Sequence, residues 1–222
     1  MRTIIYSFLF ALLLISCVDY EADHETRIGT NFQNLKTAIL ANKGSEALEY
    51  VHANTTSYFS YVLYESRYTD SSEISSYSVK DKLMILLVRH LCTKDQLSDF
   101  DRNTLMAFLI DQWTLGKNSI NDVTIRHINV DKDTARCQVF KNNLKTGNYV
   151  DFYQVQQQWK IDISLLYRSL SQGLRELIKN SRMEENDFIL NAIHEFSGRQ
   201  PDSTIWKPKL KRAVFKIKKS KS

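Results

Sequence analysis

The stretch VTIRHINVDKDTARCQVFKNNLKTGNYVDFYQVQQQWKIDI, residues 123–163, decides the fold of this chain. Apolar and polar side chains alternate along it, which is typical of strands that are buried on one face. The alternation restarts after three turn-like segments, at 131–133, 146–148 and 156–158. Short turns between alternating runs favour antiparallel pairing. We therefore expect one curved antiparallel sheet, with the large indole of Trp159 buried in its last strand.

Helical patterns flank this sheet on both sides. Before it, apolar residues recur at helical spacing from Asn31, a suitable N-cap, and Ser78 begins a further helix with an approximate capping box. After it, helical patterns cover 165–179 and 184–196. Helices, a meander of strands and helices again predict an α+β domain over residues 31–206, in which helices cover one face of the sheet.

The first residues have the anatomy of an export signal rather than of a membrane span. Arg2 supplies a positive start, and residues 4–15 form an almost unbroken apolar run that is too short to remain across a bilayer. The run closes with Leu-Ile-Ser-Cys at 14–17. Residues 17–30 have the composition of a tether between the membrane and the fold.

The four residues at 14–17 resemble the lipobox of bacterial lipoproteins, in which the signal is cut before a cysteine that then carries the lipid. This resemblance implies a signal peptide at 1–16 and a lipid such as palmitate on Cys17. It also implies a cell-envelope protein that is anchored to a bacterial membrane, with the outer membrane favoured, and that faces the periplasm or the exterior.

Two further stretches resemble a nuclear transport factor 2-like domain: AILANKGSEALEYV at 38–51, as a helix, a glycine break and a second helix, and QWKIDI at 158–163, as a last strand. The resemblance implies a cone-like fold in which N-terminal helices pack into a strongly curved antiparallel sheet, here followed by C-terminal helices. The chain departs from that pattern in its long helical insert at 78–113 and in its continuation from 164 to 222. These departures leave the position of a pocket mouth open.

The basic charge of the chain is concentrated at its C-terminus. The net charge is +5, but residues 207–222 hold eight basic side chains and no acidic one, so the body at 17–206 is mildly acidic. A nucleic-acid partner would depend on this tail alone, and we do not expect one. We expect a solvated tail, with contact to anionic lipid head groups as the alternative.

Local motifs for catalysis and metal binding are missing from the sequence. The five histidines are scattered, and no metal-ligand spacing, nucleophile elbow or phosphate loop occurs. No catalytic residue, metal ligand or cofactor is therefore predicted. Once Cys17 is assigned to lipid, Cys92 and Cys137 remain, and two free buried thiols are favoured over a disulfide.

Three residues are candidates for lining a pocket. His127 shares a predicted strand face with Val123 and Ile125, where a neutral imidazole could reach an interior; a hydrogen-bonded core or edge histidine is the simpler interpretation. Tyr58 and Tyr61 could line a ligand cavity, although tyrosines at helical spacing are more often part of an amphipathic core.

These observations favour a lipid-anchored module that binds a protein partner or a small apolar ligand without chemistry. A small-pocket isomerase, dehydratase or hydrolase on the same fold is the first alternative, with Asp151 or Asp162 as a general base; we expect both carboxylates on the solvated sheet face instead. A structural envelope lipoprotein whose basic tail contacts anionic surfaces is the second alternative. Fold alone does not decide between them.

Overall fold

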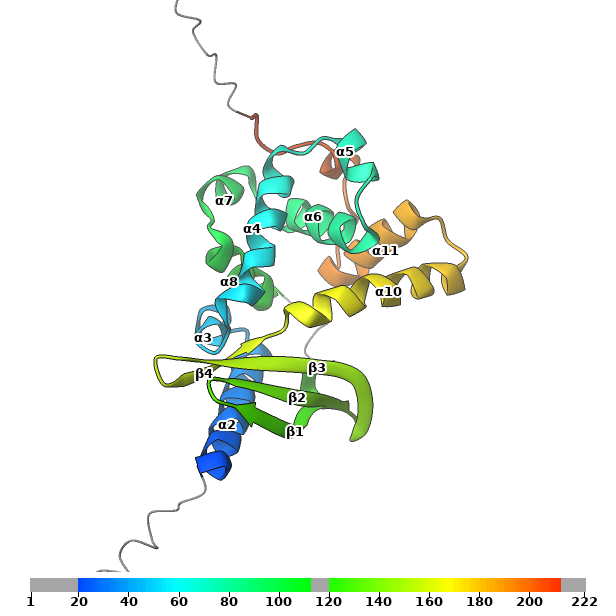
Figure 1. Cartoon of the computed structure of the whole chain (residues 1–222). Coiled ribbons are helices and arrows are strands. Elements are labelled where there is room, and N and C mark those ends of the chain that lie inside the picture. The colour runs from blue at the N-terminus through cyan, green and yellow to red at the C-terminus, as the bar shows by residue number, and fades with distance from the viewer. Residues whose placement is uncertain (1–19, 113–119, 213–222) are drawn as a thin grey trace, which may run out of the picture.

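Helices and one antiparallel sheet form the chain in the computed structural model, which describes residues 20–112 and 120–212 (Figure 1). The predicted α+β class and the predicted antiparallel sheet are both confirmed. The strands pair in the order β1-β2-β3-β4, with bounds Val123–Asp131, Thr134–Lys141, Leu144–Val155 and Gln158–Asp162. The helices are α2 (Tyr20–Leu40), α3 (Gly44–Leu48), α4 (Ala53–Tyr68), α5 (Ser71–Ser75), α6 (Val79–Leu91), α7 (Lys94–Asp99), α8 (Arg102–Gln112), α10 (Ser164–Ser181) and α11 (Glu185–Ser197), with a turn of 3-10 helix at Ser203–Trp206.

One face of the sheet shares an apolar core with the helices that precede it. Phe32 of α2 packs in the same cluster as Phe152 and Trp159 of the sheet. Trp159 is only 1% exposed, which confirms its predicted burial, and its indole nitrogen donates a hydrogen bond to Nδ1 of His24 at 3.0 Å. Phe152 and Trp159 on this sheet face, with Phe32 and Phe59 from the helices, bury a large apolar area in the cluster.

Helix α2 begins earlier than the sequence pattern predicts. It starts at Tyr20 rather than Asn31, and it buries His24 and Ile28. These two residues are four apart and therefore lie on one helix face. Acidic and polar residues surround them in the sequence, so the inward face is too sparse to appear as an apolar repeat. The predicted tether at 17–30 is therefore wrong from residue 20 onward.

The hairpin between β2 and β3 also turns earlier than predicted. Asn142 and Asn143 form the turn, with φ angles of 51° and 62°, which asparagine tolerates better than most residues. The predicted turn at 146–148 is wrong, because these residues form a bulge inside β3 where the pairing with β2 shifts. The buried amide of Gln138 donates to two carbonyls of this bulge, at 2.6 and 2.8 Å, and so replaces the lost ladder hydrogen bonds.

The chain after the sheet builds a second apolar core with α6. The helical patterns predicted at 165–179 and 184–196 are confirmed as α10 and α11. Ser78 caps α6 as predicted, since its Oγ accepts a hydrogen bond from the backbone nitrogen of Asp81 at 3.3 Å. The buried members of this cluster are Ile74, Val79, Leu83, Ile85, Leu86, Leu87, Leu174, Ile189, Ile193 and Ile205.

A fully buried arginine joins the C-terminal segment to the helices. Arg89 of α6 is 0% exposed. Its Nε donates to the carbonyl of Ser66 at 2.8 Å, its Nη2 to the carbonyls of Glu65, at 2.9 Å, and Thr69, and its Nη1 to the carbonyl of Ile205 at 3.2 Å. Burial lowers the pKa of Arg89 to about 10. The guanidinium therefore links α6 to two segments of backbone, 65–69 and Ile205, rather than pairing with one carboxylate.

The start of the predicted basic tail lies on the fold. The backbone nitrogen of Leu210 donates to the carbonyl of Arg67 at 2.8 Å, and Arg212 lies 3.3 Å from the carboxylate of Glu73. Residues 213–222, and with them most of the predicted solvated tail, lie outside the described residues. The predicted signal at 1–16 and Cys17 also lie outside them.

The two described cysteines are both free and both buried, as predicted. Burial raises the pKa of Cys92 and of Cys137 to about 12. Both thiols are therefore protonated at neutral pH and behave as small apolar side chains. Within residues 20–112 and 120–212, no helix is long and apolar enough to cross a membrane.

Candidate functional site

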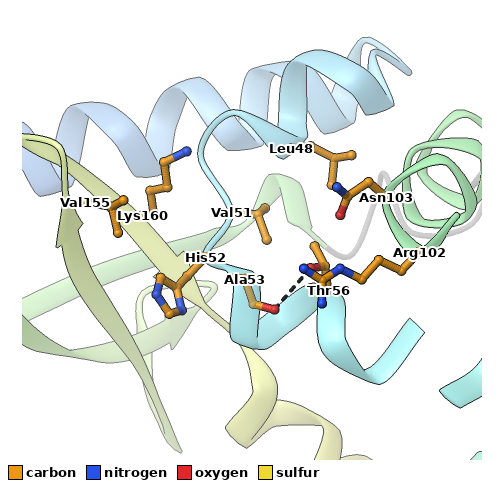
Figure 2. A pocket seen from close by; sticks show the side chains of 9 residues that line it. All are labelled: Leu48, Val51, His52, Ala53, Thr56, Arg102, Asn103, Val155 and Lys160. Atoms are coloured by element: carbon orange, nitrogen blue, oxygen red, sulfur yellow. Dashed lines mark hydrogen bonds between the residues drawn. The ribbon is translucent and has the colours of Figure 1, made fainter. Parts of the chain in front are cut away.

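A cleft of about 320 Å³ opens where the first turns of α4 and α8 approach β4 (Figure 2). This volume is at the small end of the range of roughly 300–1,000 Å³ that is usual for small-molecule sites. The lining is apolar on part of its surface and basic on the rest. It comprises Leu48, Val51, His52, Ala53, Thr56, Arg102, Asn103, Val155 and Lys160.

Backbone hydrogen bonds fix the segment that leads from α3 into α4 against the sheet. The nitrogen of His52 donates to the carbonyl of Ile161 at 2.8 Å, and the nitrogen of Ile161 donates to the carbonyl of Tyr50 at 2.8 Å. Val51 thereby forms a parallel bridge with Ile161 in β4 and is buried. Helix α4 starts at the next position after His52, so the cleft is held in a fixed relation to the end of the sheet.

His52 caps α4, and its imidazole is fixed by a hydrogen bond at Nδ1 and by stacking of its ring. Its Nδ1 accepts a hydrogen bond from the backbone nitrogen of Asn54 at 3.3 Å. Its ring stacks on Tyr153 of β3, with 4.6 Å between the ring centroids. Because Nδ1 is the acceptor, Nε2 carries the hydrogen of the neutral ring and is a donor.

Asp162 holds the neighbouring corner together. Its side chain accepts hydrogen bonds from the amide of Asn54 at 3.0 Å, the hydroxyl of Thr55 at 3.3 Å and the backbone nitrogen of Ser164 at 2.9 Å. Burial by itself would raise the pKa of Asp162, but the hydrogen bonds from Ser164 and Asn54 outweigh it and the pKa is lowered. Asp162 is only 5% exposed, so its predicted place on the solvated face is wrong. A fully bonded carboxylate with a lowered pKa is a poor general base.

Arg102 and Lys160 line different sides of the cleft (Figure 2). Among the residues that the structure describes, neither makes an ion pair with a carboxylate. The neighbouring Asp101 caps α8 by accepting from the nitrogen of Thr104 at 2.7 Å, and this hydrogen bond, with a smaller contribution from the charge of Arg102, lowers the pKa of Asp101. Two cations without ion-pair partners give the cleft a positive potential, to which the first turns of α4 and α8 add.

The structure keeps Tyr58 and Tyr61 together, but not around this cleft. Their rings lie 6.2 Å apart on α4, and the hydroxyl of Tyr58 donates to the carboxylate of Asp81 in α6 at 2.8 Å. Burial, followed by the charge of Asp81, raises the pKa of Tyr61. Tyr61 is nonetheless 37% exposed. The two tyrosines therefore form an aromatic contact within α4, and Tyr58 links α4 to α6 through its hydrogen bond to Asp81.

His127 lies on the exposed surface of the sheet, so the predicted pocket position is wrong. Its φ angle is 50°, and the pairing of β1 with β2 shifts between Arg126 and Asn129. This bulge adds a residue to β1 and moves His127 off the face that it would share with Ile125. Ile128 takes the inward position instead.

The exposed ring of His127 lies 5.7 Å from the ring of Phe140. This ring contact joins β1 to β2 on the outer side of the sheet.

A second cleft, of about 300 Å³, lies on the sheet and is lined partly by Asn129, Asp131, Arg136, Asp151 and Tyr153. Arg136 donates two hydrogen bonds to Asp151, at 2.7 and 2.9 Å. In the first cleft, no carboxylate among the described residues pairs with Arg102 or Lys160 in this way. The first cleft is therefore the better candidate for a ligand site.

One serine and one histidine approach each other as a nucleophile and a base would. Nε2 of His90 lies 2.9 Å from Oγ of Ser197. That hydroxyl also contacts the carbonyls of Ile193 at 2.8 Å and Arg199 at 3.0 Å, and it accepts from the nitrogen of Arg199. The pair lines neither cleft described above, and its contacts are those of a cap at the end of α11.

No group of three or more His, Cys, Asp or Glu side chains that could hold a metal ion occurs in the described ranges. Sequence reasoning missed His52, Arg102 and Lys160, because these residues have no motif spacing and meet only in the fold. The chain matches no family model, no curated protein and no solved structure.

Proposed function

We propose that this chain is a lipid-anchored cell-envelope protein whose domain binds a ligand without chemistry. The observation that carries the proposal is the cleft between α4, α8 and β4, in which Arg102 and Lys160 have no ion-pair partner among the described residues. A small concave site with a few uncompensated polar groups is the usual form of a ligand site.

The state of the other reactive groups supports binding over catalysis. Asp162 is occupied by three hydrogen bonds, and the hydroxyl of Ser197 is held by backbone groups. His127 lies on the sheet surface, away from the face that carries the core. The enzyme alternative needs His127, a tyrosine such as Tyr58 and a carboxylate such as Asp162 around one cavity. Tyr58 instead donates to Asp81 of α6, and none of the three residues lines the candidate cleft.

The Leu-Ile-Ser-Cys run at 14–17 supports the anchoring part of the proposal, through its resemblance to a lipobox. Helix α2 begins at Tyr20, only a few residues after Cys17. A lipid on Cys17 would therefore hold the folded domain close to the membrane surface rather than at the end of a long tether. A nuclear transport factor 2-like fold belongs to the same proposal, supported by helices that share a core with one face of an antiparallel sheet.

Replacement of Cys17 by alanine tests the anchor. We expect the Cys17→Ala variant to leave the membrane fraction, and mass spectrometry of the wild-type protein to find a lipid on Cys17. Cys137→Ala is the matched control, because it removes a buried thiol of the fold and should leave fractionation unchanged. A variant that stays with the membrane, together with a wild-type protein that carries no lipid mass, would contradict the proposal.

A further inference from the structure

We infer that the cleft between α4, α8 and β4 binds a small amphiphilic anion, with a carboxylate or phosphate head on a short apolar body. The inference rests on the proposed binding function and names the class of ligand for it. It follows from the chemistry of the lining. Some lining side chains are cationic or neutral hydrogen-bond donors, and the others are apolar.

The head group follows from the polar lining, in which Arg102, Lys160 and His52 supply donors and the side-chain oxygens are those of Thr56 and Asn103. Arg102 offers a guanidinium fork that matches two oxygens of one carboxylate or phosphate, and Lys160 adds a second cation from β4 (Figure 2). Nε2 of His52 is a further donor, since Nδ1 is occupied by the backbone of Asn54. The hydroxyl of Thr56 donates to the carbonyl of Ala53 at 3.1 Å and is thus committed to the helix.

The carboxylates nearest in sequence to Arg102 and Lys160 do not form ion pairs with them. Asp162 is buried and accepts from Asn54, Thr55 and Ser164, and Asp101 is exposed and caps α8. Neither residue lines the cleft. An oxyanion from outside the chain would supply the negative charge that the cleft lacks.

The apolar body follows from the rest of the lining. Leu48, Val51, Ala53 and Val155 supply apolar lining, whose side chains cannot hydrogen-bond a fully polar ligand. A volume of about 320 Å³ admits a head group and a short chain. An inorganic ion alone would leave this apolar lining in contact with water, so an apolar extension should increase affinity.

The experiment titrates the full chain with hexanoate, hexyl phosphate, inorganic phosphate and hexanol, and follows heat by calorimetry and backbone shifts by NMR. We expect saturable binding of at least one of the two amphiphilic anions, tighter than that of inorganic phosphate or of neutral hexanol. The tighter of hexanoate and hexyl phosphate identifies the head group. The shifted resonances should be those of residues 48–56, 102–103 and 155–160.

Two charge-removing variants, each with a matched control, locate the site. Arg102→Gln and Lys160→Gln should each raise the Kd about tenfold, which corresponds to about 1.4 kcal/mol. Arg175→Gln, on the exposed surface of α10, and Lys145→Gln, on the exposed part of β3, remove the same charges elsewhere and should leave the Kd unchanged. If Arg102→Gln does not fold, as judged by circular dichroism, Lys160→Gln decides alone.

The inference is overturned if neither amphiphilic anion binds saturably, if hexanol binds equally well, or if the cleft variants bind like their controls. Its failure is separable from failure of the proposed anchor. Cys17→Ala should retain anion binding, whereas Arg102→Gln should retain the lipid on Cys17.

Discussion

Replacement of Arg89 by methionine tests whether one buried guanidinium holds the C-terminal segment to the helices. Arg89 is fully buried and donates to the carbonyls of Glu65, Ser66, Thr69 and Ile205. Methionine keeps an unbranched apolar stem of similar reach but removes every donor. The change therefore isolates the hydrogen bonds from most of the packing.

The expected loss follows from the fate of the four carbonyls. Glu65 keeps a second donor, because the nitrogen of Thr69 donates to the same oxygen at 3.2 Å. The carbonyls of Ser66, Thr69 and Ile205 lose the Arg89 donor, at a cost of about 1–3 kcal/mol for each buried acceptor. Relief of guanidinium desolvation, which lowers the pKa of Arg89 to about 10, offsets part of this cost. We expect a net loss of about 3 kcal/mol, a large share of a typical free energy of unfolding.

The assay is urea unfolding followed by tryptophan fluorescence, together with limited proteolysis. Arg89→Met should lower the free energy of unfolding by about 3 kcal/mol, and proteolysis should cut first within residues 198–212. Arg175→Met, on the exposed face of α10, is the control and should stay within about 0.5 kcal/mol of wild type. A loss below about 1 kcal/mol for Arg89→Met, with unchanged proteolysis, would refute the reasoning.

Two further predictions concern packing. Gly44→Ala should cost about 3 kcal/mol in thermal or urea unfolding, because its Cβ would overlap the carbonyl oxygen of Ala107. Gly173→Ala, in open space on α10, should instead stabilise by about 0.5–1 kcal/mol; equal effects of the two changes would contradict the close approach of α3 to α8. Trp159→Ala should cost about 3–5 kcal/mol, and a loss below about 1 kcal/mol would mean that the indole is not buried.

The sheet could be predicted from the sequence because its signal is local. Alternation from Val123 to Ile163 indicates strands, and Trp159 is buried where that alternation places it. The turn at 146–148 was misplaced because Thr-Gly-Asn is equally suited to a bulge. Which of the two forms depends on Gln138, whose amide satisfies the bulge from the neighbouring strand. That contact does not appear in the local pattern.

The position of His127 shows how one added residue changes a candidate site. A strand without a bulge would have placed it beside Ile125 on the inward face. The shift between Arg126 and Asn129 turns it outward and lets Ile128 pack inward. Ile125 and Ile128 both pack against the core in this arrangement. Alternation alone could not reveal it, because Ile125 and Ile128 are each compatible with the inward face.

The candidate cleft was beyond prediction for a different reason: its charge depends on which ion pairs the fold forms elsewhere. The chain has 30 basic and 25 acidic residues, so a sequence offers many partners for every cation. In the fold, Arg136 forms an ion pair with Asp151 and Lys82 forms one with Glu185, with a nitrogen–oxygen distance of 2.7 Å in each pair. The fold leaves Arg102 and Lys160 without such a partner among the described residues, beside a segment held to β4 by backbone hydrogen bonds. A binding site of this kind consists of cations that no carboxylate of the fold neutralises. Only the tertiary structure determines which cations these are.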